Sequence, residues 1–222
     1  MQLREVNKGS MVVIGGRKWD VLADVEGGVL CLHHDILCKK AFDTDNCNDW
    51  KKSSLKKWLN EEFLNELRDS LRGEEPVNYC SNLITEDGLD DYGTSVDKVF
   101  LLSAEQYRKY RRFISNANDW WWLITADSTC NPYARIVGTD GSLGIDNAYG
   151  GGTGVRPACV FSSSILVDEP EKTYDVTVKL KLSCSGKCAE EIRKEIAEYF
   201  DCSEGLDIDE TTVEVEEVDE NE

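Results

Sequence analysis

The fold is decided between Phe113 and Val167, where the chain reads Trp120-Trp121-Trp122-Leu123, then Asp140-Gly141-Ser142-Leu143, then Val155-Arg156-Pro157-Ala158. Side chains alternate along a strand, so three consecutive tryptophans in a strand cannot share one face. We therefore expect Trp120 and Trp122 to point one way and Trp121 the other. One face must bury large rings, and the other needs protein cover or a ligand.

The segment between Arg112 and Arg156 has one cation, Arg135, and is otherwise rich in Asn, Asp, Ser, Thr, Gly, Tyr and Trp. In antibody-like contact surfaces, rigid aromatic rings supply area and small polar groups supply adaptable hydrogen bonds. The same composition is also typical of ordinary loops and turns. Composition alone leaves both interpretations open.

The strands and helices around this segment predict an α+β domain. Apolar runs separated by glycine pairs indicate a three-stranded meander, and leucine and aromatic residues at helical spacing indicate a helix that begins at Ser53 or Ser54 and ends near Arg72. Asp140-Gly141 indicates a hairpin. The expected strands are 11–14, 17–22, 29–32, 98–102, 133–137 and 143–145, and a second helix should open at the capping box of residues 103–106.

The chain has 222 residues and a net charge of −18, and this charge is uneven. Residues 168–222 carry 19 acidic and 6 basic residues, a net charge of −13, which leaves −5 for residues 1–167. We therefore predict two domains, 1–167 and 168–222. The negative charge argues against binding to nucleic acid or to anionic membranes.

The acidic C-terminal domain is expected to be a small β-α-β unit. Its strands are predicted at 175–182 and 211–216, and its helix at 189–200. A unit of this size is too small to be comfortably stable alone. We expect it to dock on the main domain or on a copy of itself, which would make the protein a homo-oligomer.

The nine cysteines occur at irregular spacings, with no Cys-x-x-Cys pair. We interpret them as reduced thiols of a cytoplasmic protein, with Cys31 and Cys159 as small core residues. His33 and His34 are adjacent, so in a strand their rings point apart and a structural role is favoured. The N-terminus lacks a signal-peptide pattern, no apolar run is long enough to span a membrane, and we predict no metal and no cofactor.

Five runs in this order resemble a family of bacterial and phage proteins of uncharacterised function. The resemblance covers about residues 10–167 and lies in Ser54-Leu55-Lys56-Lys57-Trp58-Leu59-Asn60, Val99-Phe100-Leu101-Leu102-Ser103, Trp121-Trp122-Leu123, Asp140-Gly141-Ser142-Leu143 and Val155-Arg156-Pro157-Ala158. Members of that family look like C-type-lectin-like folds, and some resemble the variable proteins diversified by retroelements. Typical calcium-binding motifs of lectins are absent from this chain.

The resemblance implies a ligand-binding scaffold whose contact residues lie between Trp122 and Tyr149. It implies a protein or cell-surface ligand, and a virion-associated protein if the gene belongs to a phage. The chain has Trp121-Trp122-Leu123-Ile124-Thr125 where the family commonly has Trp-Trp-Leu-Arg-Ser, which removes the arginine of an anion site. Carried over by position, the contact residues are Trp122, Ile124, Thr125, Asp127, Thr129, Asn131, Tyr133, Ile136, Thr139, Asp146, Asn147 and Tyr149.

We predict a binding protein rather than an enzyme, because the chain has two histidines, no Gly-x-Ser-x-Gly and no phosphate loop. One competing hypothesis is a thiol enzyme similar to formylglycine-generating oxidases, which would need Cys130 and Cys159 to meet in a cleft. Asp140 and Asp146 could pair as acid and base, although Asp beside Gly more often forms turns. A third interpretation is a structural component of a phage particle or its assembly, whose acidic tail contacts another protein.

Overall fold

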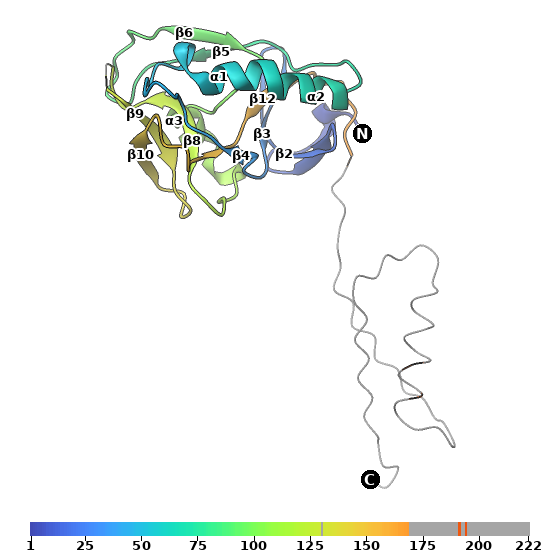
Figure 1. The fold of residues 1–222 in the computed structure, drawn as a ribbon. Helices are drawn as coiled ribbons and strands as arrows, with labels where there is room; N and C mark the ends of the chain where they lie inside the picture. Colours follow the sequence, from blue (N-terminus) through green and yellow to red (C-terminus); the bar gives the residue numbers. More distant parts are fainter. Residues whose placement is uncertain (130, 169–190, 192–193, 195–222) are drawn as a thin grey trace. The chain divides into compact units, whose positions relative to one another are not determined.

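The computed structural model describes residues 1–129 and 131–168, together with Glu191 and Lys194. The chain divides into two compact units, Met1–Lys172 and Thr173–Glu222. The predicted β-α-β unit, its expected role in an oligomer and Cys130 lie outside the described residues. Within residues 1–168 the architecture is α+β, as the sequence predicts (Figure 1).

The first sheet has five strands in the order β1-β2-β3-β12-β7, and every neighbouring pair is antiparallel. Its N-terminal half is the predicted meander. A side chain at Gly28 would lie 2.0 Å from the carbonyl oxygen of Phe161, so the close approach of β3 and β12 requires glycine there. The strands are β1 (Met11–Ile14), β2 (Arg17–Val25), β3 (Gly28–His33), β7 (Val99–Phe100) and β12 (Ala158–Phe161).

The second sheet also has five strands, in the order β10-β9-β8-β11-β4. The predicted hairpin is confirmed, with Gly141 at a φ of +82° in its turn, and β11 pairs parallel to β8. The strands are β4 (Cys38–Lys39), β8 (Trp121–Ala126), β9 (Tyr133–Val137), β10 (Leu143–Asn147) and β11 (Gly154–Val155). A separate hairpin joins β5 (Tyr79–Asn82) to β6 (Thr94–Asp97), in a stretch where the sequence shows mainly turns.

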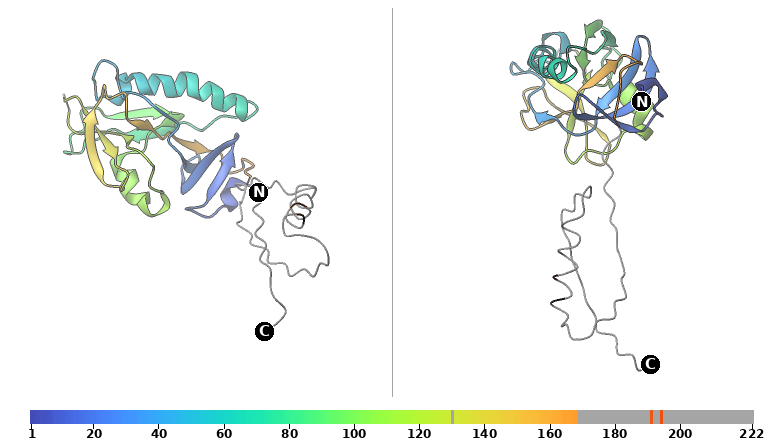
Figure 2. Two further views of the ribbon diagram at one scale, coloured as in Figure 1. Left: turned by 60° about the horizontal axis from the view of Figure 1, so that its bottom comes forward. Right: turned by 90° about the vertical axis from the view of Figure 1, so that its right-hand side faces the viewer.

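The first predicted helix is continuous from residue 54 to residue 70, and Figure 2 (right) shows it end-on beside the strands. It consists of α1 (Ser54–Trp58), a π-helical segment η3 (Leu59–Phe63) and α2 (Leu64–Ser70). Ser53 caps its first turn, as its hydroxyl accepts from the amide of Lys56.

The second helix, α3 (Ala104–Tyr110), opens with the predicted capping box of Ser103 and Gln106 and continues into the 3₁₀ turn η4 (Arg111–Phe113). Two further 3₁₀ turns, η1 (Leu3–Glu5) and η2 (Trp50–Lys52), complete the helical elements of the described residues. No helix in this described part is long and apolar enough to cross a membrane.

Trp121 and Trp122 are covered by protein on both faces of their strand, which is one of the two alternatives that the sequence left open for the second face. Trp121 packs edge-on against Tyr107 of α3, with ring centroids 5.7 Å apart, and Trp122 packs in the same way against Phe42. Both are buried, whereas Trp120 precedes the strand and is 51% exposed. The central strand β8 therefore belongs to the core throughout its length.

One arginine lies within this core. Arg156 is fully buried, and its guanidinium lies over the Trp121 ring at 4.9 Å from the centroid. Its Nε donates to the carbonyl oxygen of His33 (3.1 Å), Nη1 to that of Ser115 (3.2 Å) and Nη2 to Oδ2 of Asp20 (3.2 Å). Burial lowers the pKa of Arg156, and the Asp20 carboxylate opposes that shift. The residue thus joins the first sheet to the segment that leads into β8.

Candidate functional site

Four of the twelve predicted contact residues are buried in the core: Trp122, Ile124, Thr125 and Ile136. The prediction that they contact a ligand is corrected here, because a ligand at the surface cannot reach them. Trp122 Nε1 donates to the carbonyl oxygen of Lys40 (2.9 Å), and Thr125 Oγ1 accepts from the amide of Ala104 (2.9 Å) at the start of α3. These side chains have structural partners.

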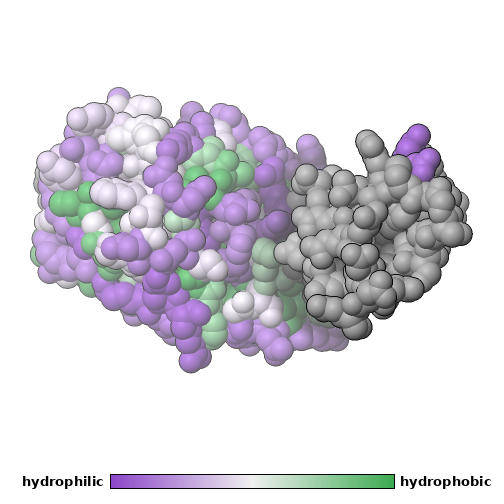
Figure 3. All heavy atoms as spheres, turned by 90° about the horizontal axis from the view of Figure 1, so that it is seen from below, coloured by the Kyte–Doolittle hydropathy of each residue, from purple (hydrophilic) through white to green (hydrophobic). Residues whose placement is uncertain are grey.

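The other eight predicted residues reach the surface. Tyr133, Thr139 and Tyr149 are exposed, and five residues are partly exposed. Figure 3 shows one side of the molecule, where hydrophilic residues predominate and hydrophobic residues form small separate areas. Exposed aromatic side chains on such a surface are candidates for contact with a partner. The five partly exposed residues are Asp127, Thr129, Asn131, Asp146 and Asn147.

The antiparallel pairing of β9 and β10 brings several of these side chains onto one surface. Tyr133 lies opposite Asn147, and Arg135 lies opposite Ile145. Side chains alternate along a strand, so these four share one face, while the intervening residue Ala134 is buried. We call Tyr133, Arg135, Ile145 and Asn147 the hairpin face. Tyr133 is 36% exposed and Ile145 is 42% exposed.

The loop after β10 presents Tyr149, which is 59% exposed. The backbone at and just before it is held in place: the amide of Ala148 donates to the carbonyl oxygen of Pro132 (2.7 Å), and the amide of Tyr149 donates to Oδ1 of Asn46 (3.3 Å). Asp146, a predicted contact residue, accepts from the Thr153 hydroxyl (2.8 Å) instead of pairing with Asp140. The Tyr149 ring is thus exposed on an anchored loop.

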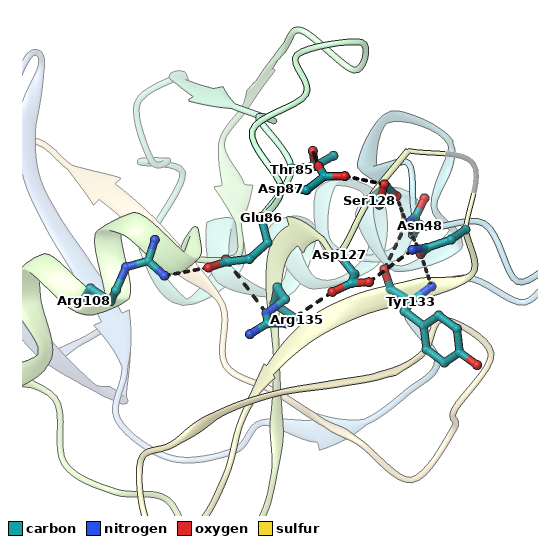
Figure 4. Close-up of polar contacts among 10 residues, drawn as sticks. Asn48, Thr85, Glu86, Asp87, Arg108, Asp127, Ser128, Tyr133 and Arg135 are labelled. Carbon is teal, nitrogen blue, oxygen red and sulfur yellow. Dashed lines mark hydrogen bonds and ion pairs between the residues drawn. The ribbon is translucent and has the colours of Figure 1, made fainter.

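A chain of ion pairs runs from α3 to the hairpin face (Figure 4). Arg108 Nη1 lies 3.0 Å from Oε1 of Glu86, whose Oε2 lies 3.9 Å from Nε of Arg135. Arg135 Nη1 in turn lies 3.3 Å from Oδ1 of Asp127. The Arg135 side chain is only 17% exposed. Its Nε has no hydrogen-bond partner in the described part of the chain.

The turn between β8 and β9 is held by Asn48, a buried residue from a distant segment (Figure 4). Its Nδ2 donates to the carbonyl oxygens of Ser128 (2.7 Å) and Tyr133 (2.9 Å) and to Oδ1 of Asn131 (3.1 Å). The Ser128 hydroxyl donates to Asp87 (2.6 Å). Hydrogen bonds from Ser128 and a neighbouring threonine lower the pKa of Asp87. The site is therefore pre-formed by side chains far apart in sequence.

The sequence reasoning missed Asn48, Glu86 and Asp87 as parts of this site. Asn48 and Glu86 come from loops that carry no local signal for contact with β8 and β9. Arg135 did carry a signal, since it is the lone cation of its segment.

The residues that the sequence offered as candidates for catalysis have structural surroundings in the described part of the chain. Cys159 is fully buried, and burial together with the adjacent Cys31 raises its thiol pKa well above 9.0. Both cysteines are core residues, as predicted. Asp140 accepts from the amide and hydroxyl of Ser142 in the hairpin turn, and these bonds lower its pKa. Among the residues that the structure describes, no group of three or more His, Cys, Asp or Glu could hold a metal ion.

The two histidines have separate partners. His33 Nδ1 lies 2.8 Å from the carbonyl oxygen of Asp35, and His34 Nδ1 lies 2.6 Å from Oδ1 of Asp20. Asp20 also bonds to Arg156, so His34 lies at the edge of the buried network around that residue. These contacts give both rings a structural role.

Fold and site together define a class: an α+β domain with an exposed, pre-formed aromatic and polar surface on one hairpin. The chain belongs to the family described as Domain of unknown function (DUF6273), whose model matches residues 26–163. This span includes the hairpin face, the Tyr149 loop and Arg156. No curated protein and no solved structure matches the chain.

Proposed function

We propose that this protein binds a protein or cell-surface ligand through the hairpin face and the Tyr149 loop. The observation that carries the proposal is the pair of exposed tyrosines, Tyr133 and Tyr149, on backbone held by hydrogen bonds. A tyrosine ring offers a large contact area and loses little conformational entropy on binding. Because the backbone is already held in place, less conformational entropy is lost when the ligand binds.

The composition of the surface supports a macromolecular ligand rather than a buried small molecule. The hairpin face combines Tyr133 and Ile145 with the amide of Asn147 and the partly buried guanidinium of Arg135. Interfaces between proteins are enriched in tyrosine and arginine, and their apolar centre is bordered by polar groups. The face is a surface of two strands, and such a flat site suits another surface.

We further propose that the domain has a C-type-lectin-like fold and is a variable protein diversified by a retroelement. The α+β architecture supports the fold, as does the pairing of the first residues with the segment after β12, where Gln2 bridges to Leu166 and Val13 to Asp168. Diversification is supported by the separation of surface from core, since exposed side chains can change without altering core volume. The protein would then be located in the cytoplasm, or on the virion if a phage encodes it.

Sequencing of the gene in many sibling clones tests the diversification. The proposal predicts changes at the exposed positions, above all Tyr133, Asn147 and Tyr149, next to a reverse-transcriptase gene and a template repeat. The buried positions Trp122 and Ile136 should not vary. The absence of changes between Trp122 and Tyr149, or changes spread equally over buried and exposed positions, would contradict diversification. The binding proposal is tested separately.

Site-specific cross-linking tests the binding proposal. Tyr149 is replaced by a photo-reactive benzophenone amino acid, and the matched control carries the same group at Leu166, which is 74% exposed. After illumination in host-cell extract, the proposal expects mass spectrometry to identify the same cross-linked protein in repeated experiments at position 149 and not at position 166. Equal capture at both positions, or none at either, would remove the support for this surface.

A further inference from the structure

The strand β10 has an open outer edge. It is the terminal strand of the second sheet, and its inner side pairs with β9 (Figure 1). The amide of Gly138 donates to the carbonyl oxygen of Ser142 (2.8 Å) at the start of this ladder. Hydrogen-bonded pairs alternate in an antiparallel ladder, so the N–H and C=O groups of Leu143 and Ile145 point away from β9. These four groups have no hydrogen-bond partner among the described residues.

Both edges of the first sheet, by contrast, are covered by other groups. On β1, Val13 and Asp168 exchange backbone hydrogen bonds of 2.9 and 3.2 Å. On β7, the Asn60 side chain accepts from the amide of Val99 (3.2 Å) and donates to its carbonyl oxygen (2.8 Å). The fold thus closes these two edges and leaves the outward groups of β10 for a partner.

The β10 edge also lacks the features that keep exposed strands apart, which are outward charges, proline and bulges. Its five residues pair with β9 without a register shift and contain no proline. Its one charged side chain, Asp146, accepts from the Thr153 hydroxyl (2.8 Å). Ile145 is 42% exposed and Leu143 is partly exposed, and both lie on the same face of the strand. The edge therefore offers apolar side chains beside unpaired backbone groups.

We propose that β10 pairs antiparallel with β10 of a second copy of this chain, about a twofold axis at Gly144. Leu143 then lies opposite Ile145 of the second copy, and the reverse pair forms on the other side of the axis. These two pairs make four backbone hydrogen bonds, which satisfy all the outward groups of Leu143 and Ile145 in both copies. Each pair also brings a leucine and an isoleucine side chain together across the contact.

The hydrogen bonds within each copy select this register. A pairing centred on Ile145 would require the backbone groups of Asn147, but its carbonyl oxygen accepts from the amide of Gly150 (2.7 Å) and its amide donates to Oδ1 of Asp146 (2.8 Å). A pairing centred on Gly144 leaves both of these bonds intact. It also places Asp146 opposite Ser142 of the second copy, so like charges do not face each other directly.

The dimer goes beyond the proposed function, because it can form whether or not the hairpin face binds a ligand. Ile145 belongs to the hairpin face, and the pairing continues that face across the axis. The two hairpin faces then form one surface of four strands, to which each copy contributes Tyr133 and Asn147. A ligand with two matching epitopes would bind such a surface more tightly than it binds one copy.

Sedimentation equilibrium of the full chain tests the pairing, in reducing buffer at about 0.15 M salt, where charges more than ~8 Å apart are largely screened. We expect a concentration-dependent rise to twice the monomer mass. Ile145→Lys places two like charges at the contact and should weaken the dimer at least about tenfold. The matched control is Val96→Lys on β6, where Val96 is 60% exposed, and this variant should dimerise as the wild type does.

Disulfide trapping tests the register. Opposed residues of a non-hydrogen-bonded pair have Cα atoms about 4.5 Å apart, within the range that a disulfide spans, so Gly144→Cys should form a covalent dimer with oxidised glutathione. A Cβ at Gly144 would lie 3.4 Å from the Ile136 side chain, which is ordinary contact. Ile145→Cys is the control, since its two copies lie on a diagonal and should not be bridged. Peptide mass spectrometry identifies the linked cysteines.

Three results would overturn the proposal. The first is a wild type that stays monomeric up to about 0.5 mM, since the association would then be too weak to matter. The second is an Ile145→Lys variant that dimerises as strongly as the wild type, which would place the contact on another part of the chain. The third is a covalent dimer through Cys at position 145 and not at position 144, which would exclude the register centred on Gly144.

Discussion

The guanidinium of Arg156 has no exposure to solvent, and its charge is balanced by Asp20 alone among carboxylates within ion-pair distance in the described residues. Removing one partner of a buried pair leaves the other charge desolvated without compensation. We therefore predict that Arg156→Met lowers the free energy of unfolding by about 3–5 kcal/mol in urea titrations.

The control for Arg156→Met is Arg112→Met, since Arg112 is exposed and its guanidinium lies over the Phe113 ring. That change should cost less than about 1 kcal/mol. Adding Asp20→Asn to Arg156→Met should recover part of the loss, because no uncompensated charge then stays buried. A loss below 1 kcal/mol in Arg156→Met would contradict the structural role of the buried arginine.

Burial lowers the pKa of His33 below 6.5 in the folded protein. Below pH 6.5 the unfolded chain therefore binds more protons than the folded chain does at this residue, so the stability contributed by neutral His33 is lost as the pH falls. We predict that His33→Asn, which keeps a donor toward Asp35, flattens the fall in stability between about pH 7 and pH 5. Parallel stability curves for wild type and variant would refute this.

The cysteines differ in their access to reagents. Cys31 and Cys159 lie opposite each other on β3 and β12, both without exposure, and burial raises the thiol pKa of each. We predict that iodoacetamide at about pH 8 modifies exposed Cys80 in the native protein and reaches the two core thiols only after unfolding. Rapid native-state modification of Cys159, read by peptide mass spectrometry, would instead favour the thiol-enzyme hypothesis.

The π-helical segment η3 has a structural cause in Asn60. Its Oδ1 accepts from the amides of Lys98 and Val99 (both 3.2 Å), and its Nδ2 donates to the carbonyl oxygens of Val99 (2.8 Å) and Lys56 (3.1 Å). The widened turn thus directs this amide toward the backbone of β7. A helix and a short strand are joined by one side chain.

Asn60→Ala should therefore lower the free energy of unfolding by about 1–3 kcal/mol, because it leaves buried backbone groups of β7 without partners. The matched control is Asn65→Ala on the same helix, where the exposed side chain accepts a hydrogen bond from Arg68; we expect a loss below about 0.5 kcal/mol there. Urea titrations of both variants measure the two values. Equal losses in the two variants would show that helix propensity, not the bonds to β7, determines the effect.

Elements with local signals could be predicted from the sequence. The capping box at Ser103, the Gly141 turn and the apolar spacing from Leu55 to Leu67 each lie within a few residues, so they are visible without tertiary context. The β5–β6 hairpin was missed because the buried positions of its strands include the polar residues Ser81, Ser95 and Asp97, so the sequence does not alternate between polar and apolar residues although burial alternates. The pairing of β11 with β8 depends on distant segments and has no local signature.

The site was only partly predictable, because contacts between segments far apart in the sequence have no local signal. The sequence located the exposed tyrosines Tyr133 and Tyr149 but assigned four core side chains to the same surface. Position in a motif does not show that β8 is covered on both faces, since that depends on Tyr107 and Phe42 from remote segments. A segment rich in polar residues can therefore contain both exposed contact residues and buried core residues.

On the scale of the whole molecule, the core and the candidate binding surface are separate. The side chains of Tyr133, Asn147 and Tyr149 make no hydrogen bond or ion pair with another described residue; only their backbone groups do. Truncating them removes contact area for a partner while leaving the network around Asn48 and Asp146 intact. Binding and stability should then respond independently to substitution.

The most direct test is the dissociation constant of the cross-linked partner, once purified, for the wild type and for the triple variant Tyr133→Ala, Asn147→Ala and Tyr149→Ala. We predict binding at least about tenfold weaker, with a change in the free energy of unfolding below about 1 kcal/mol. A control triple variant at the exposed residues Leu89, Val96 and Leu166 should bind as the wild type does. Unchanged affinity in the first variant, or equal losses in both, would contradict the assignment of binding to the hairpin face and the Tyr149 loop.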